Sequence, residues 1–157
     1  MQRQNAVVDA SFWINAERSQ LVAYLPEYFA LWVPPLVVEE LTAATPFADW
    51  LQRGEARLLT PEGRFGRFDA GENEAIALAL ERDWVLLIDD QAPRHFSRGP
   101  LRLRVVDSPA FAVFLYDRGR LNHSETIAAL HQSQAGRRMV SEALVALELL
   151  ARRKGER

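Results

Sequence analysis

The stretch Trp84-Val85-Leu86-Leu87-Ile88-Asp89-Asp90 says more about the fold than any other part of the chain. Its first five residues are continuously apolar, as expected for a strand that is covered on both faces of a parallel sheet. The alanine- and leucine-rich segment before it, residues 72–81, predicts a helix. The two aspartates then lie just beyond the carboxyl end of the strand, which is where ligands bind in sheets of this kind.

Strand and helix signals alternate along the rest of the chain, which predicts βαβ units and a parallel sheet. We therefore expect one three-layer α/β/α domain over residues 1–157, with about five strands and a long loop over residues 60–71. Strands are predicted over residues 6–8, 29–33, 56–59, 84–88 and 101–106, and helices over residues 11–16, 19–24, 35–41, 46–52, 72–81, 108–118, 124–132 and 138–153.

Composition narrows the class of protein. The 157 residues include no cysteine, which excludes a disulfide framework, a thiolate zinc site and a cysteine nucleophile. No apolar run approaches the ~20 residues of a membrane helix, and the first residues lack the apolar region of a signal peptide, so a cytoplasmic protein is expected.

The charged residues are distributed unevenly along the chain. Residues 1–99 hold 9 basic and 15 acidic residues, whereas residues 100–157 hold 10 basic and 6 acidic ones. This uneven charge excludes a uniformly basic nucleic-acid coat but allows an acidic pocket beside arginines.

Acidic residues follow the predicted strands or begin the predicted helices at one edge of the sheet. Taken singly, each fits a turn, a helix cap or a solvated face, so the prediction rests on their conjunction. Carboxylates that share a cleft repel one another unless a cation compensates, and oxygen ligands with open positions suit Mg²⁺ or Mn²⁺. Such a site is suited to phosphodiester cleavage. The acids are Asp9, Glu39, Glu40, Glu72, Glu74, Asp89 and Asp90.

Four stretches in this order resemble the PIN domain, a metal-dependent nuclease fold found in many toxin–antitoxin ribonucleases. Each motif is weak alone, but four in the correct order are fairly specific, and they span about residues 5–150. The double proline, the Gly-Glu-x-Glu-Ala pattern and the Ile-Asp-Asp-x-x-x-Arg pattern resemble one largely uncharacterised prokaryotic branch. The stretches are residues 7–11 (VVDAS), 33–41 (VPPLVVEEL), 71–79 (GENEAIALA) and 86–94 (LLIDDQAPR).

The resemblance implies a strand order of 3-2-1-4-5 and a set of four acids that serve as both catalytic residues and metal ligands. The chain departs from the family at Ile88, where threonine is more common, so the choice between Asp89 and Asp90 stays open. By position, the four acids are Asp9, Glu40, Glu74 and Asp90, and the secondary candidates are Ser11, Glu39, Glu72, Asp89 and Arg94.

The secondary candidates also have ordinary structural interpretations. Ser11 fits a helix cap better than a phosphate contact. Arg94 lies about one helical turn after Asp90 and could pair with it or touch a phosphate. Asn15 fits a surface position better than the cleft. The four tryptophans fit a core better than base-stacking platforms, with Trp13 as the exception to watch.

The resemblance implies a Mg²⁺- or Mn²⁺-dependent endoribonuclease, with RNA as substrate, a small antitoxin protein as a possible partner and a homodimer as the expected assembly. The alternative is a catalytically weak module with the same fold that binds nucleic acid or protein. A receiver-like domain also has acids at strand ends, but it needs a lysine after a late strand, and the only lysine is Lys154 in the tail. Neither a Walker loop, a dinucleotide fingerprint nor a nucleophile elbow is present.

Overall fold

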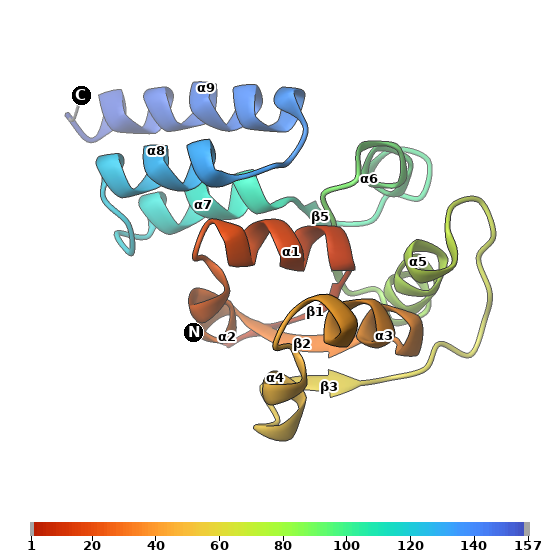
Figure 1. Cartoon of the computed structure of the whole chain (residues 1–157). Coiled ribbons are helices and arrows are strands. Elements are labelled where there is room, and N and C mark those ends of the chain that lie inside the picture. Colours follow the sequence, from red (N-terminus) through yellow and green to blue (C-terminus); the bar gives the residue numbers. More distant parts are fainter. Residues whose placement is uncertain (1, 156–157) are drawn as a thin grey trace.

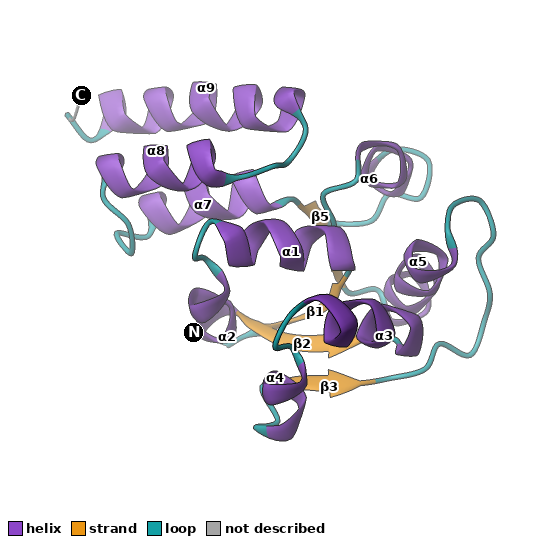
Figure 2. Cartoon of the chain, viewed as in Figure 1, coloured by secondary structure: helices purple, strands orange, loops and turns teal. Residues whose placement is uncertain are grey.

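The structure is a computed structural model that describes residues 2–155 of the chain. Five short strands form one sheet, and helices cover it (Figures 1 and 2). The strands are β1 (Gln4–Val8), β2 (Phe29–Val33), β3 (Ala56–Leu58), β4 (Val85–Leu87) and β5 (Val105–Val106). The helices are α1 (Ala10–Arg18), η1 (Val22–Tyr24, a 3₁₀ helix), α2 (Leu25–Tyr28), α3 (Pro35–Ala44), α4 (Ala48–Gln52), α5 (Ala70–Arg82), α6 (Gln91–Arg98), α7 (Ser108–Asp117), α8 (His123–Gln132) and α9 (Arg137–Arg153).

The sheet has the order β3-β2-β1-β4-β5, and all of its pairings are parallel. Both the α/β class and the strand order are therefore confirmed. Val7 of β1 faces Trp32 of β2 on one side and Leu86 of β4 on the other. The order reverses between β1 and β4, so a crevice is expected where the carboxyl ends of these two strands meet.

The core explains why the central strands are so apolar. Ala6, Val7 and Val8 of β1 are fully buried, as are Leu86 and Leu87 of β4. Right-handed crossovers with this strand order place α1, α3 and α4 over one face of the sheet, and α5 and α6 over the other. Both faces of β1 and β4 are thereby covered, which is the environment that the unbroken apolar run predicts.

The C-terminal third of the chain forms a helical layer of its own, in which α7, α8 and α9 lie side by side (Figure 1). α7 also contacts α1 and so joins this layer to the rest of the fold. In the described part of the chain, no helix combines the length and the apolar character needed to cross a membrane.

The predicted elements differ from the structure in three places. The strand predicted over residues 101–106 is reduced to two residues, because Arg102 has a left-handed backbone (φ 54°) and Leu103 bonds to Ser97 instead of a strand. The helix predicted from Ser19 is wrong at its start, since Ser19 ends α1 as its C-cap and the next turn begins at Val22. The predicted elements also omit α6, a short helix with arginine, histidine and proline in place of an apolar stripe.

Candidate metal centre

A cluster of acids lies at the carboxyl ends of β1 and β4, where the strand order leads us to expect the crevice. One carboxylate oxygen from each of Asp9, Glu72 and Asp90 lies within 4.8 Å of the other two. Asp9 follows β1 directly, and its backbone N–H donates to the carbonyl of Leu87 at 2.9 Å, which ties it to β4. Asp90 precedes α6, and Glu72 lies in the first turn of α5. Three segments far apart in the sequence thus bring carboxylates to one point.

Glu72 is placed in the cluster by the way in which α5 begins. Asp69 is the N-cap, and its side chain accepts a hydrogen bond from the Glu72 backbone N–H at 2.9 Å. The Glu72 side chain in turn accepts one from the Asp69 N–H, which completes a capping box. This reciprocal pair sets the phase of the helix and buries Glu72, which is 8% exposed.

Glu74 does not join the three clustered acids. Its Oε1 accepts a hydrogen bond from the Leu36 backbone N–H at 2.8 Å, at the start of α3. Residues two apart in a helix face different directions, so Glu72 and Glu74 cannot both face the crevice. The structure therefore gives Glu72, a secondary candidate from the sequence, the place expected for Glu74.

Glu40 lies at the margin of the cluster. Its charge acts on Asp9, and the charges of Asp69 and Asp90 act on it. A side chain at Gly71 would collide with the Glu40 carboxylate, so the glycine is what allows α3 and α5 to bring this acid close. Glu39, its neighbour in the chain, is likewise exposed to solvent, and it is not among the clustered acids.

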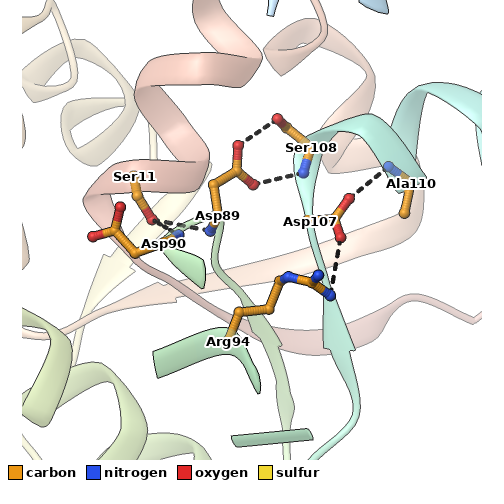
Figure 3. Close-up of polar contacts among 7 residues, drawn as sticks. All are labelled: Ser11, Asp89, Asp90, Arg94, Asp107, Ser108 and Ala110. Atoms are coloured by element: carbon orange, nitrogen blue, oxygen red, sulfur yellow. Dashed lines mark hydrogen bonds and ion pairs between the residues drawn. The ribbon is translucent and has the colours of Figure 1, made fainter. Parts of the chain in front are cut away.

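Ser11 organises the backbone around the crevice (Figure 3). Its hydroxyl donates to Oδ2 of Asp9 at 2.6 Å and accepts from the backbone N–H groups of Asp89 and Asp90, at 3.0 and 3.2 Å. The serine thus links the end of β1 to the end of β4. The prediction that Ser11 caps a helix is wrong, because Asp9 is the N-cap of α1 and accepts from the Ser11 N–H.

Asp89 has a structural environment quite unlike that of Asp90. Its carboxylate accepts hydrogen bonds from Asn15 Nδ2 at 2.7 Å, from the Ser108 N–H at 2.7 Å and from Ser108 Oγ at 2.6 Å. It is buried, and it joins α1, β4 and α7, while the Asp90 carboxylate points elsewhere (Figure 3). The structure thus brings Asp90 into the cluster and sets Asp89 apart, and the surface position expected for Asn15 is wrong.

Arg94 is also drawn away from the crevice. It is 5% exposed, and its guanidinium lies 3.5 Å from the carboxylate of Asp107, the residue that caps α7 (Figure 3). The predicted pairing with Asp90 is therefore not found. This buried arginine links α6 to the N-cap of α7, and its guanidinium is not exposed to solvent.

Trp13 belongs to the core. It is fully buried and makes edge contacts with Phe47 and Trp50, each with ring centroids 4.8 Å apart. Trp13 therefore has the core position expected for the tryptophans in general, and it is not available as a base-stacking platform.

The clustered acids are only partly compensated for their burial and for their mutual repulsion, and their pKa values are raised. The pKa of Asp9 is raised to about 7, mainly by burial and also by the charges of Asp90 and Glu40, while the hydrogen bonds from Ser11 oppose the shift. Burial also raises the pKa of Glu72, with a hydrogen bond to Asp90 as the next cause. Burial raises the pKa of Glu40 as well, helped by Asp69 and Asp90. A divalent cation would relieve this repulsion.

Comparison with known proteins agrees with the fold. A family model described as DUF3368, PIN domain, matches residues 5–146, so the chain belongs to this PIN-domain family. Among solved structures, the chain is similar to a PilT N-terminus domain protein, SSO1118, from the hyperthermophilic archaeon Sulfolobus solfataricus P2. That match has a TM-score of 0.52 and 18% identity, and it covers 66% of this chain and 87% of the other. No curated protein matches the chain significantly.

Proposed function

We propose that this chain is a Mg²⁺- or Mn²⁺-dependent endoribonuclease. The observation that supports the proposal most is the convergence of Asp9, Glu72 and Asp90 within 4.8 Å at the switch point of the sheet. The PIN-domain family is typically one of nucleases, and an acidic site of this composition suits the hydrolysis of a phosphodiester bond.

The donor set fits a hard divalent cation. All three groups offer carboxylate oxygens, which Mg²⁺ and Mn²⁺ prefer. In Asp9, both hydrogen bonds from Ser11 fall on Oδ2, so Oδ1 can bind a cation while these bonds are kept. When bound, the metal supplies Lewis-acid polarisation of a phosphoryl oxygen and a more acidic water as nucleophile.

The protein residues have separate tasks in this proposal. Asp9, Glu72 and Asp90 hold the cation, and Glu40 adds negative charge at the margin of the site. Ser11 fixes Asp9 relative to Asp90, because one hydroxyl bonds to the carboxylate of the first and the backbone of the second. Asp89 holds the carboxyl end of β4 in place through Ser108 and Asn15.

The biological setting forms part of the proposal. We infer that the substrate is RNA, that the enzyme acts as the toxin of a toxin–antitoxin pair, and that it forms a homodimer. A neutralising antitoxin would be a small protein that places a basic side chain among the carboxylates. Such a side chain would compensate the same charges as the metal, which makes the two mutually exclusive.

A second candidate function is an RNA-binding module with a weakened site. Ile88 favours it, because this residue is fully buried and offers no hydroxyl to a water beside the acids. Ser11 weighs against it, since a hydroxyl group is nevertheless present between Asp9 and Asp90.

The test is Mn²⁺-dependent cleavage of varied RNAs by the purified protein and by Asp9→Asn. The substitution keeps size and shape but removes a charge from the cation site, so we expect cleavage to fall at least ~100-fold. Asp49→Asn, at an exposed aspartate in α4, is the matched control and should cleave normally. Absence of cleavage by the native protein would favour the binding module. Undiminished cleavage by Asp9→Asn would refute the assignment of the site.

A further inference from the structure

A hollow of about 610 Å³ lies beside the acids, between α6 and the loop that precedes α5. We call it the arginine–phenylalanine groove and define it by the residues that matter to the argument: Arg67, Phe68, Gln91, His95, Phe96 and Arg138. No carboxylate lines it, whereas the hollow on the other side of the same loop contains Glu62 and Glu74. Its size is within the range of pockets that hold a small molecule or a nucleotide.

Both walls of the groove are directly connected to the acid cluster. Gln91, the first residue of α6, follows Asp90 in the chain. On the opposite wall, Phe68 precedes Asp69, whose side chain holds Glu72 in its capping box. A ligand in the groove therefore lies next to the crevice of Asp9, Glu72 and Asp90.

The loop wall is held in place rather than left free. The side chain of Asn73 accepts hydrogen bonds from the N–H groups of Arg67 and Phe68, at 3.1 and 2.9 Å. It also donates to the carbonyl of Phe68 at 2.9 Å. Arg67 is exposed and Phe68 is half-buried, so this loop presents a cation and a ring at fixed positions.

The helix wall has a face suited to stacking. Pro93, Arg94 and Ser97 of α6 are buried, which leaves Gln91, His95 and Phe96 toward the groove. The guanidinium of Arg67 lies 4.1 Å above the ring of Phe96, and Phe68 meets the same ring at 6.0 Å. A guanidinium plane that lies on an aromatic ring offers its other face to a nucleic-acid base.

A third segment supplies another cation. Gly136, just before α9, lies beside α6, since a Cβ there would be 3.7 Å from Oε1 of Gln91. This contact brings Arg138 to the groove, where its side chain is exposed and has no carboxylate beside it among the lining residues. Because Arg94 is committed to Asp107, cations for a phosphate next to the acids must come from positions such as these.

We propose that the arginine–phenylalanine groove binds one unstacked nucleotide of single-stranded RNA beside the acid cluster, with the base on Arg67 and a phosphate on Arg138. The inference rests on the proposed function, which supplies RNA as the substrate. It follows that the groove selects single strands, because a base within a duplex cannot reach the face of Arg67.

The test measures binding without cleavage. The native chain and Arg67→Ala/Arg138→Ala are titrated, in EDTA, into a fluorescent single-stranded RNA of ten nucleotides and into the same sequence as a duplex. The expected result for the single strand is a loss of affinity of at least about tenfold and a salt slope smaller by about 0.7, which corresponds to the one phosphate contact of Arg138. Arg152→Ala/Arg153→Ala removes the same charge from exposed positions at the end of α9 and should bind normally.

A second variant separates stacking from charge. Arg67→Lys keeps the charge but loses the planar guanidinium, so we expect weaker single-strand binding with an unchanged salt slope. Unaltered binding by the double variant would overturn the proposal. So would an equal loss in the Arg152/Arg153 control, or an equal loss for the duplex.

Failure of the groove and failure of the nuclease proposal give different results. Mn²⁺-dependent cleavage together with binding that ignores Arg67 and Arg138 would refute the groove alone. Absence of cleavage together with arginine-dependent binding would refute the nuclease and support the groove as an RNA-binding site.

Discussion

Asp9 and Asp89 lie at the ends of two neighbouring strands, and each is 3% exposed, yet they have opposite surroundings. Asp89 accepts hydrogen bonds from Asn15 and from two atoms of Ser108, and these donors oppose the effect of burial, so its pKa is raised only to about 6. Among the described residues, the Asp9 carboxylate accepts hydrogen bonds only from Ser11. It lies close to Glu72 and Asp90, and its pKa is raised to about 7.

The difference shows how one sheet edge serves two purposes. A buried carboxylate surrounded by donors joins secondary-structure elements and needs no further partner. A buried carboxylate that lies close to other carboxylates is repelled by them, and a bound cation can offset this repulsion. The following predictions test this contrast.

The largest expected effect is on stability at Asp89. Asp89→Ala leaves the donors of Ser108 and Asn15 buried without an acceptor, which should lower the free energy of unfolding by about 3 kcal/mol. Urea denaturation of the metal-free protein measures this. Asp90→Ala is the matched change at the next residue, and it should leave stability equal or higher because it removes repulsion from the cluster. Equal losses in the two variants would contradict the contrast.

The second largest expected effect is on the cleavage rate, and it distinguishes the roles of the two glutamates of α5, Glu72 and Glu74. Glu72→Gln keeps an acceptor for the Asp69 N–H but removes a charge from the cation site, so cleavage should fall about 100-fold. Glu74→Gln keeps an acceptor for Leu36 and should change the cleavage rate little. Initial rates on one RNA at saturating Mn²⁺ provide the comparison. A greater loss in Glu74→Gln would restore the assignment made from the sequence.

The third prediction concerns pH. The Asp9 pKa of about 7 lies above its ordinary value, so between about pH 4 and 7 the folded chain holds a proton that the unfolded chain has released. Stability without metal should therefore fall as pH rises through this window, and it should go on falling toward about pH 9, because the pKa of Glu72 is raised to about 9. Thermal melts in EDTA should show a drop of roughly 3–6 °C for a change of 1–2 kcal/mol.

Two comparisons make the pH experiment specific. Asp9→Asn should have a smaller slope, although Asp89 contributes a drop of the same sign below its own pKa of about 6. Mn²⁺ should raise the melting temperature more at pH 8 than at pH 6, because it binds the ionised acids. A melting temperature of the native protein that rises from pH 5 to 8 in EDTA would refute this account of the cluster.

The smallest effect concerns Glu40. Gly71→Ala pushes the Glu40 carboxylate away from α5, and we expect affinity for Mn²⁺ to fall about threefold to tenfold, or about 1 kcal/mol. Stability should stay the same or rise slightly, since alanine favours a helix more than glycine does. Titration calorimetry on folded protein measures the affinity. Glu40→Gln should reproduce the loss, and unchanged affinity in both variants would remove Glu40 from the site.

Most of the fold could be predicted from the sequence because its signals are local. The apolar run before Asp89 predicts a strand covered on both faces, and Phe29–Val33 is predicted with its observed bounds. The strand order came from the family resemblance. Residues 101–106 show the limit of local signals, since an apolar alternation there gives only a two-residue strand where the backbone turns at Arg102.

Which glutamate of α5 joins the cluster depends on the residue at which this helix begins, and the sequence gives part of that information. Asp69 and Glu72 have the spacing of a capping box, which would have started α5 two residues earlier than predicted and turned Glu72 inward. The sequence also placed Asp9 at the strand end without ambiguity, because an acid directly after a short apolar strand has one position available.

The choice between Asp89 and Asp90 belonged to the tertiary structure alone. Successive residues at the end of a strand point to opposite faces of the sheet. A strand that is buried on both faces has no polar side, so its sequence does not indicate which of the two aspartates points toward the cluster. Hydrogen bonds from Ser108 and Asn15 hold the Asp89 carboxylate away from the cluster, whereas the Asp90 carboxylate lies within it. Likewise, Asp107, thirteen residues further along the chain, takes Arg94. The sequence determined that acids gather at this edge, and long-range hydrogen bonds decided which of them remain free for a cation.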